Sequence, residues 1–241
     1  MGNQVFAKWA LGYSGCDGGD MGSPESPSTW ICGIEWGGGH SKEDLIGELE
    51  TDVTRPPSGY TDWQTNLAYI YNWQVMKLLS VINGGNVKNY KEFAQKAKPF
   101  IRAELGYFKA NLYPIGFKDT SQSRWLAEFS ELTGCQTKQE YIEWCKKNRF
   151  PQMYQWVVAH KPKLIICLGK TYKEDFIAAF ANEGIQFNTE LIDDREISWA
   201  FNALGSLVVI LPFMVNRNGL VKNVSIQKVG QRIAALLQEQ T

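Results

Sequence analysis

Glu35 is the side chain whose position most clearly suggests chemistry. It lies two positions beyond Gly33, where the apolar run 29–32 ends, and Trp36 and three glycines follow it. A carboxylate in such a loop could activate water or stabilise positive charge, and the glycines let a ligand approach the backbone. We interpret Glu35 as the candidate catalytic residue. A solvated loop glutamate is the alternative that fits the same residues.

Polar side chains also follow two later apolar runs. Asn111 precedes a turn at Pro114, and its amide offers the donor and the acceptor with which proteins read a base edge. Asn216, Arg217 and Asn218 form a polar loop suited to phosphate contacts. Both segments also fit ordinary turns, in which Asn is common.

Several other chemistries are disfavoured. His40 and His160 are the only histidines, which argues against a polyhistidine metal centre, and the chain has no P-loop, G-x-S-x-G or H-E-x-x-H motif. The acidic, glycine-rich segment 15–20 lacks the closing Glu of an EF-hand. We interpret it as a loop, with Asp17 as a reserve catalytic candidate. The five cysteines are widely spaced without C-x-x-C, so we expect them to be reduced and structural.

The composition fits one globular domain. The chain has 241 residues, of which 44% are hydrophobic and 21% charged, which excludes disordered and coiled-coil classes. No apolar run reaches the roughly 18 residues of a membrane span, and the first residues lack the regions of a signal peptide. We therefore expect a single domain over residues 1–241, no membrane association and a cytoplasmic location, with the oligomeric state left open.

Apolar runs alternate with helical patterns along the chain. We expect strands at 29–32, 107–113, 163–169 and 207–212, and helices at 42–50, 67–82, 89–97, 138–147, 151–160, 171–182 and 225–238. This alternation predicts a three-layer α/β/α sandwich with a mostly parallel central sheet. Ligands bind such sheets beyond the carboxyl ends of the strands, which is where Glu35, Asn111 and the loop 216–218 are expected.

The formal net charge of zero hides a gradient along the chain. Residues 1–85 carry 4 basic and 10 acidic side chains, residues 86–173 carry 16 and 7, and residues 174–241 carry 5 and 8. Binding to a phosphate backbone depends on local positive charge more than on overall charge. The basic segment 86–173 is therefore a candidate DNA-binding surface, and a solvated, lysine-rich helical face is the alternative.

Three motifs at the strand ends resemble those of the uracil-DNA glycosylase superfamily. Gly33-Ile34-Glu35-Trp36-Gly37 is similar to the loop that opens its active site, Asn111-Leu112-Tyr113-Pro114 to its mid-chain strand end, and Leu168-Gly169-Lys170 to its late glycine turn. The resemblance covers most of the chain and implies the α/β fold of the superfamily. It further implies that Glu35 positions or activates the attacking water, that Asn111 reads a flipped base, and that the turn at Lys170 faces the DNA backbone.

The chain departs from the superfamily in two motifs. The last motif usually contains His-Pro-Ser, whose His stabilises the departing base, whereas the stretch from Leu211 to Asn216 has no histidine. Phe213 or Met214 would be the residue that wedges into the duplex. The first motif has Trp-Gly-Gly-Gly in place of a tightening proline, and small glycines leave volume for a larger, modified base.

The activity that the resemblance implies is hydrolysis of the N-glycosidic bond of an enlarged base flipped out of DNA, in repair or in defence against modified viral DNA. The expected base-binding residues are Gly33, Ile34, Trp36, Asn111 and Tyr113, and the expected DNA contacts are Lys170, Phe213, Asn216, Arg217 and Asn218. No metal or organic cofactor is expected, because the cysteine spacing does not match the iron–sulfur cluster of some superfamily members. Two alternatives stay open: a non-catalytic nucleic-acid or nucleotide-binding protein of the same fold, and a small-molecule nucleoside hydrolase.

Overall fold

The computed structural model describes residues 3–117, 125–182 and 184–239. Its strands are β1 (Gly18–Gly19), β2 (Gly22–Ser23), β3 (Ser26–Pro27), β4 (Thr29–Gly33), β5 (Tyr107–Asn111), β6 (Leu164–Leu168), β7 (Asn188–Ile192), β8 (Arg195–Phe201) and β9 (Leu207–Leu211). In the described residues, β2 and β3 form a small hairpin, and the others form one seven-stranded sheet in the order β1-β5-β4-β6-β9-β8-β7.

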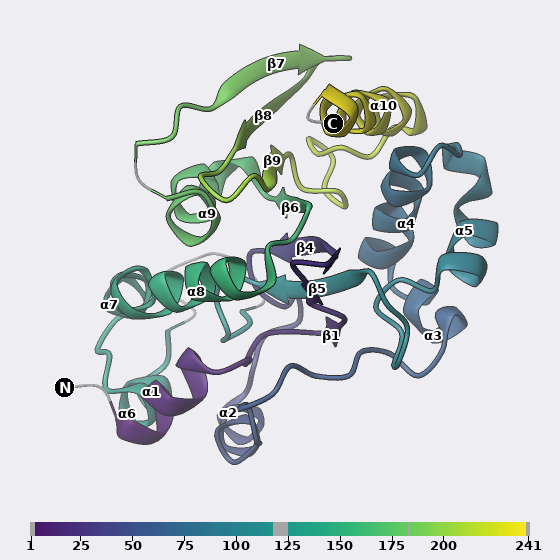
Figure 1. The fold of residues 1–241 in the computed structure, drawn as a ribbon. Coiled ribbons are helices and arrows are strands. Elements are labelled where there is room, and N and C mark those ends of the chain that lie inside the picture. Colours follow the sequence, from purple (N-terminus) through teal and green to yellow (C-terminus); the bar gives the residue numbers. More distant parts are fainter. Residues whose placement is uncertain (1–2, 118–124, 183, 240–241) are drawn as a thin grey trace.

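Helices cover both faces of this sheet, so that the chain forms three layers (Figure 1). One face carries α1 (Gln4–Leu11), α6 (Ala127–Thr133), α7 (Lys138–Trp144), α8 (Phe150–His160) and α9 (Lys173–Phe180). The other face carries α4 (Ile70–Ile82), α5 (Tyr90–Ala97) and α10 (Asn223–Glu239). The helices α2 (Lys42–Leu49) and α3 (Trp63–Leu67) lie in the connection between β4 and α4. This arrangement confirms the α/β class and the layered architecture expected from the sequence.

The four central strands β5, β4, β6 and β9 run parallel, whereas β1, β8 and β7 pair antiparallel at the two edges. Along β4, Trp30 and Cys32 pack into the core under α7 and α8, and Ile31 packs into the core under α4 and α10. This burial on both faces explains why β6 and β9 are continuous apolar runs in the sequence. In the parallel register Gly33 pairs with Asn111, so that β4 and β5 end side by side.

Some elements depart from the sequence expectations. The expected helix 67–82 is interrupted: α3 ends at Leu67, and Tyr69 is extended before α4 begins. The helices expected at 138–147 and 151–160 are joined by a π-helical turn at Cys145–Arg149. The hairpin of β7 and β8 was not predicted, because β7 lies at an exposed edge of the sheet and has no continuous apolar run.

Asp20 fastens the β2–β3 hairpin to the loop that leads into β5. Its carboxylate accepts hydrogen bonds from Gly22 N (3.0 Å), Gly106 N (2.6 Å) and Ser28 Oγ (2.9 Å). Partial burial raises the pKa of Asp20, but these hydrogen bonds outweigh burial, and the net pKa lies below its usual range. Asp20 therefore joins two segments of the chain that are distant in sequence.

We expect Asp20→Asn to lower the free energy of unfolding by about 1–3 kcal/mol at neutral pH, because an amide accepts fewer of these hydrogen bonds. A carboxyl group with a depressed folded pKa contributes its stability above the unfolded pKa, and the contribution is lost as the pH falls through the folded pKa. The difference between wild type and variant should therefore shrink in acid. Urea unfolding at about pH 7 and at about pH 3, below the ordinary Asp pKa of about 3.9, measures it; a difference that grows in acid would contradict this role.

Candidate functional site

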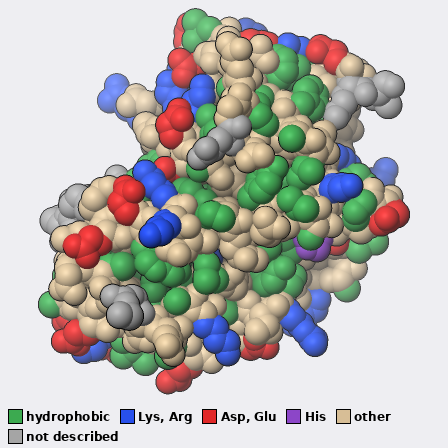
Figure 2. All heavy atoms as spheres, turned by 60° about the vertical axis from the view of Figure 1, so that its left-hand side comes forward, with side chains coloured by type: hydrophobic (Ala, Val, Ile, Leu, Met, Phe, Trp, Pro, Cys, Tyr) green, Lys and Arg blue, Asp and Glu red, His purple; other side chains and the backbone are tan. Residues whose placement is uncertain are grey.

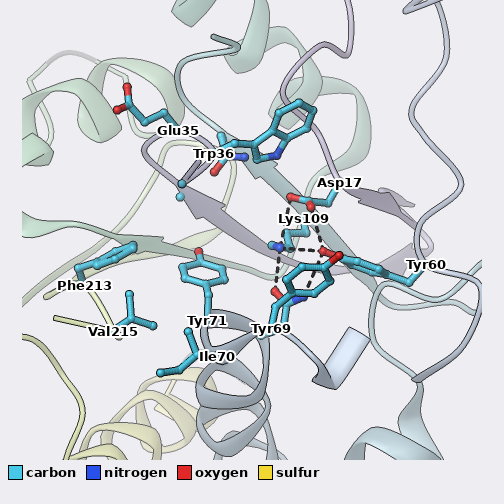
Figure 3. A pocket seen from close by; sticks show the side chains of 14 residues that line it. Asp17, Glu35, Trp36, Tyr60, Tyr69, Ile70, Tyr71, Lys109, Phe213 and Val215 are labelled. Atoms are coloured by element: carbon cyan, nitrogen blue, oxygen red, sulfur yellow. Dashed lines mark hydrogen bonds and ion pairs between the residues drawn. The ribbon is translucent and has the colours of Figure 1, made fainter. Parts of the chain in front are cut away.

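A cavity of about 550 Å³ lies beyond the carboxyl ends of β4 and β5, between the start of α4 and the loop after β9 (Figure 3). This is the position at which parallel sheets bind ligands. Three of the residues expected to bind a base line it, namely Gly33, Trp36 and Asn111, as does Glu35. The other lining residues are Asp17, Gly37, Tyr60, Tyr69, Ile70, Tyr71, Asn72, Lys109, Phe213 and Val215.

The floor of this cavity is a network of four polar side chains (Figure 3). Lys109 Nζ donates to Asn72 Oδ1 (2.8 Å) and to Tyr60 OH (3.2 Å), and it forms an ion pair with Asp17 Oδ2 at 3.3 Å. Tyr60 OH in turn donates to Asp17 Oδ1 (2.9 Å) and accepts from Asn72 Nδ2 (3.1 Å). We call these residues the polar floor. They offer a ligand both charges and both hydrogen-bonding roles within a few ångströms.

Burial shifts the pKa values of two residues of the polar floor. It lowers the pKa of Lys109, and the neighbouring Asp17 carboxylate opposes that shift. Burial also raises the pKa of Tyr60, and the Asp17 charge raises it further. Tyr60 therefore keeps its proton and its role as a donor to Asp17. The Lys109 ammonium and the Asp17 carboxylate form an ion pair between side chains that are both largely buried, so each offsets the cost of burying the other's charge.

Glycines in β1 bring Asp17 to this floor. Asp17 N donates to Lys109 O (3.0 Å), and Gly18 then pairs with Lys109 in the antiparallel register of β1 and β5. Gly18 has φ +103°, and a Cβ there would clash with Pro57 O. A side chain is therefore excluded at Gly18. The expectation of a loop over segment 15–20 was wrong for Gly18–Gly19, which form an edge strand.

Tyr71 contributes a buried hydroxyl group that has no hydrogen-bond partner among the residues that the structure describes. It lines the cavity between Gly33 and Phe213, and its ring centroid lies 5.7 Å from that of Phe213. Lys109 Nζ lies 5.0 Å from the centroid of the Tyr71 ring. Burial raises the pKa of Tyr71, so its hydroxyl stays protonated. A buried donor without a partner, placed on a cavity wall, is suited to a ligand acceptor.

Asn111 lies on the wall as expected, but part of its amide is already engaged. Its Nδ2 donates to Gly15 O (3.0 Å), and its Oδ1 lies against Gly33. A Cβ at Gly33 would clash with this oxygen and lie 3.3 Å from Tyr71 OH. The glycine that ends β4 therefore makes room for the two side chains that could contact a ligand.

We expect Gly33→Ala to lower the free energy of unfolding by about 1–3 kcal/mol, because the added methyl group forces Asn111 and Tyr71 to move. Chemical denaturation of the purified variant measures the change. Gly37→Ala is the matched control, since an added Cβ there meets no atom within 4 Å, and it should change stability by less than about 0.5 kcal/mol. Equal effects of the two substitutions would show that Gly33 is not tightly surrounded.

Glu35 lies at the boundary between this cavity and a second one of about 410 Å³. Its side chain points away from the polar floor in Figure 3, and its Oε2 lies 3.9 Å from Nζ of the buried Lys138. Lys138 in turn lies over the Phe117 ring, 3.9 Å from its centroid. Glu35 is therefore placed beside a buried ammonium at the junction of the two cavities.

The second cavity contains most of the residues expected to contact DNA. Lys170, Phe213, Asn216 and Asn218 line it, whereas Arg217 is exposed beside it. Ile34, which was expected to bind the base, also lines this second cavity and not the first. Lys170 Nζ also lies 3.9 Å from Glu196, in an ion pair that is about half exposed on both sides. Because Glu35 and Phe213 line both cavities, the two hollows adjoin.

Two sequence-predicted residues lie elsewhere. Tyr113 lines neither cavity: its ring is buried in the core, and its hydroxyl donates to Asp175 Oδ2 (2.7 Å). Met214 is fully buried in the core under α4 and α10, so it is not available as a wedge, whereas Phe213 is partly exposed. The structure adds residues that the sequence did not single out, namely Tyr60, Tyr69, Ile70, Tyr71, Asn72 and Lys109. A lysine inside an otherwise apolar strand was the signal that could have located Lys109.

The basic segment 86–173 uses part of its charge inside the protein. Lys109, Lys138 and Arg149 are all buried. Arg149 donates to Leu112 O (2.8 Å), Ser14 O (2.7 Å) and Ala10 O, which ties the chain before Asp17 to the end of β5. On the face shown in Figure 2, basic side chains are scattered among acidic and apolar ones. The excess of basic residues therefore does not translate into a continuous basic surface on that face.

Within the described ranges, no three His, Cys, Asp or Glu side chains are grouped so that they could hold a metal ion. All five cysteines are free and buried. None of the described helices has the length and apolar character needed to cross a membrane.

Neither family models, nor curated proteins, nor solved structures match this chain.

Proposed function

We propose that this chain is a divergent member of the uracil-DNA glycosylase superfamily that hydrolyses the N-glycosidic bond of an enlarged, modified base in DNA. One observation carries the proposal: the 550 Å³ cavity at the carboxyl ends of the parallel strands has aromatic walls above a charged, hydrogen-bonding floor. Flat rings with polar edges are the ligands that such a cavity suits. A role in DNA repair or in defence against modified viral DNA follows from this substrate.

The base would enter the first cavity after flipping out of the stack, at an unstacking cost of a few kcal/mol. Trp36, Tyr71 and Phe213 supply ring surfaces, and Asn111 supplies its amide oxygen. The cavity volume lies in the range of pockets that hold drug-sized ligands. This size supports a base that carries an additional group rather than a bare pyrimidine.

The proposed reaction is attack of water on the anomeric carbon while the carbon–nitrogen bond to the base breaks. Glu35 orients the water, accepts the proton that the water loses as its oxygen bonds to the anomeric carbon, and stabilises the positive charge that develops on the sugar. The electron pair of the broken bond leaves with the base, whose negative charge faces the Lys109 ammonium and the Tyr71 hydroxyl. The positive charge of Lys109 and the hydroxyl donor of Tyr71 would take the part of the histidine that the last motif lacks, and the released base then takes a proton from solvent.

The second cavity would hold the strand next to the flipped nucleotide. Lys170, Asn216 and Asn218 supply a cation and two amides for phosphate oxygens. DNA is therefore the proposed partner, bound through loops at the strand ends.

Formation of abasic sites tests the proposal. Purified protein is incubated with end-labelled DNA that carries uracil, hypoxanthine, hydroxymethylcytosine or glucosylated hydroxymethylcytosine, and alkali then cleaves the strand at each abasic site. We expect cleavage at one of the enlarged bases. Salt-sensitive DNA binding with no abasic product on any substrate would favour the non-catalytic alternative. Release of bases from free nucleosides alone would favour the nucleoside hydrolase.

A further inference from the structure

The polar floor contains hydrogen-bond donors and acceptors, but its donors are taken up inside the protein. The Lys109 ammonium has three hydrogens and lies against all three other members of the polar floor. The single hydroxyl hydrogen of Tyr60 goes to Asp17. The two Nδ2 hydrogens of Asn72 go to Tyr60 OH and to the backbone oxygen of Asn66. A ligand that reaches the polar floor therefore finds donors that are already bonded and acceptors whose capacity is not fully used.

The Asp17 carboxylate holds the acceptor with the fewest partners. Its Oδ1 accepts the hydrogen bond from Tyr60, whereas its Oδ2 has the ion pair with Lys109 at 3.3 Å and accepts no hydrogen bond within the described part of the chain. This oxygen is buried, and Asp17 lines the first cavity. A buried carboxylate oxygen without a donor costs stability, and a donor on a ligand removes that cost. An N–H or O–H group is therefore the complement of this position.

Tyr71 supplies the opposite role beside this oxygen. Its hydroxyl is buried without a hydrogen-bond partner among the described residues, and it is protonated because burial raises its pKa, so it donates to a ligand acceptor. Figure 3 shows Asp17 and Tyr71 on either side of the Lys109 ammonium, which lies 3.3 Å from Asp17 Oδ2 and 5.0 Å from the centroid of the Tyr71 ring. The complementary ligand edge has a donor beside an acceptor.

The edges of the bases differ in this pattern. In cytosine and adenine, an exocyclic amino group that donates stands next to a ring nitrogen that accepts. In uracil, thymine and hypoxanthine, a carbonyl oxygen takes the place of the amino group, and the ring nitrogen beside it carries a hydrogen. That carbonyl oxygen would face the Asp17 carboxylate, so that two acceptors oppose each other. Such a mismatch is costly in a buried place, because neither group can find water.

We propose that Asp17 determines the specificity of the site by accepting a hydrogen bond from an exocyclic amino group, so that cytosine- and adenine-type bases are selected over their carbonyl counterparts. Tyr71 donates to the ring nitrogen beside that group. This inference rests on the proposed function and assigns the chemical class of the enlarged base. It also agrees with the proposed reaction, because the ring nitrogen shares the negative charge of the leaving base and faces the Tyr71 hydroxyl.

Binding of free bases tests the inference without any reaction, because a free base has no glycosidic bond to break. 5-Hydroxymethylcytosine and 5-hydroxymethyluracil carry the same added group and differ only at the edge that Asp17 and Tyr71 contact. Equilibrium dialysis against the wild-type protein measures the affinity for each. We expect the cytosine-type base to bind at least about tenfold more tightly, which is the discrimination that a well-placed polar contact to a base edge gives. Equal binding, tighter binding of the uracil-type base, or no binding of the cytosine-type base would overturn the inference.

Asp17→Asn changes the group that selects the base. The amide brings an N–H donor to a position that only accepts in the wild type, so we expect the ratio of the two affinities to fall at least about tenfold. Asp194→Asn is the matched control and should leave the ratio unchanged, since Asp194 is exposed in the turn between β7 and β8 and its backbone (φ +61°) suits asparagine. A folded Asp17→Asn protein with the wild-type ratio would remove Asp17 from base selection.

Two further measurements separate the possible failures. Asp17→Asn removes the charged partner of Lys109, so urea unfolding establishes how much of the variant is folded, and the wild-type comparison of the two bases does not depend on this variant. Formation of abasic sites in single-stranded DNA that carries 5-hydroxymethylcytosine reports on hydrolysis. Selective binding of the cytosine-type base without abasic sites would refute the proposed hydrolysis and support selection by Asp17. Abasic sites together with equal binding of the two bases would overturn the selection and leave the proposed hydrolysis standing.

Discussion

Replacement of Lys109 by Met is expected to lower the free energy of unfolding by about 3–5 kcal/mol, because it leaves the Asp17 carboxylate largely buried without its charged partner. The substitution also removes the donor to Asn72 and one of the donors to Tyr60, so the polar floor loses the group that joins its other three members. Met keeps most of the volume of the lysine stem, so the loss reports on charge and hydrogen bonds more than on packing.

A double-mutant cycle with Asp17→Asn measures the coupling within the polar floor. We expect the double variant to be more stable than the sum of the single effects implies, with a coupling energy of about 1–3 kcal/mol, because it contains no unpaired charge. Lys88→Met is the matched control, since Lys88 is exposed at the surface, and it should change stability by less than about 0.5 kcal/mol. Additive effects of the two pocket substitutions would show that Asp17 and Lys109 act independently.

Glu35→Gln is expected to lower the rate of base release by at least about 10²-fold, because an amide of nearly the same shape can neither stabilise positive charge nor polarise water as a carboxylate does. The loss should appear in kcat with little change in KM, as expected for an interaction that strengthens in the transition state. Glu92→Gln, which removes an exposed carboxylate on α5, should leave kcat unchanged.

The neighbouring Lys138 allows structural and catalytic effects of Glu35 to be separated. Loss of the carboxylate leaves the Lys138 ammonium beside a neutral amide, so some stability is lost as well. Denaturant unfolding of Glu35→Gln shows how much protein is folded under assay conditions, and rates are compared for folded protein only. A folded variant with wild-type turnover would remove Glu35 from the mechanism.

The central sheet could be predicted from the sequence because a strand that is buried on both faces consists mainly of consecutive apolar residues. Of the four parallel strands, β6 and β9 are unbroken runs of apolar residues, such as Leu164–Leu168, whereas β5 contains Lys109 and Asn111; all four were found close to their expected positions. The edge hairpin of β7 and β8 carries polar residues on its exposed side and has no such run. The break between α3 and α4 depends on hydrogen bonds from Asn66 and Asn72. The helical spacing of apolar residues in the sequence gives no indication of these bonds.

Of the candidate site, the sequence predicted only residues that lie at or directly after the ends of strands. Glu35 and Asn111 line the cavity because β4 and β5 end side by side. Tyr113 does not, because β5 stops at Asn111 and the chain beyond it turns into the core. The polar floor joins Asp17, Tyr60, Asn72 and Lys109, which are dispersed along the chain, and no local pattern in the sequence pairs them.

The central claim is that water replaces a base on the sugar of a flipped nucleotide. The most direct measurement is mass analysis of both products after a single turnover in water enriched in the heavy oxygen isotope, with DNA that carries the enlarged base. We predict release of the intact base without heavy oxygen, and one heavy oxygen atom at the anomeric carbon of the abasic strand. Heavy oxygen in the released base, or recovery of the DNA with its base still attached, would contradict the account.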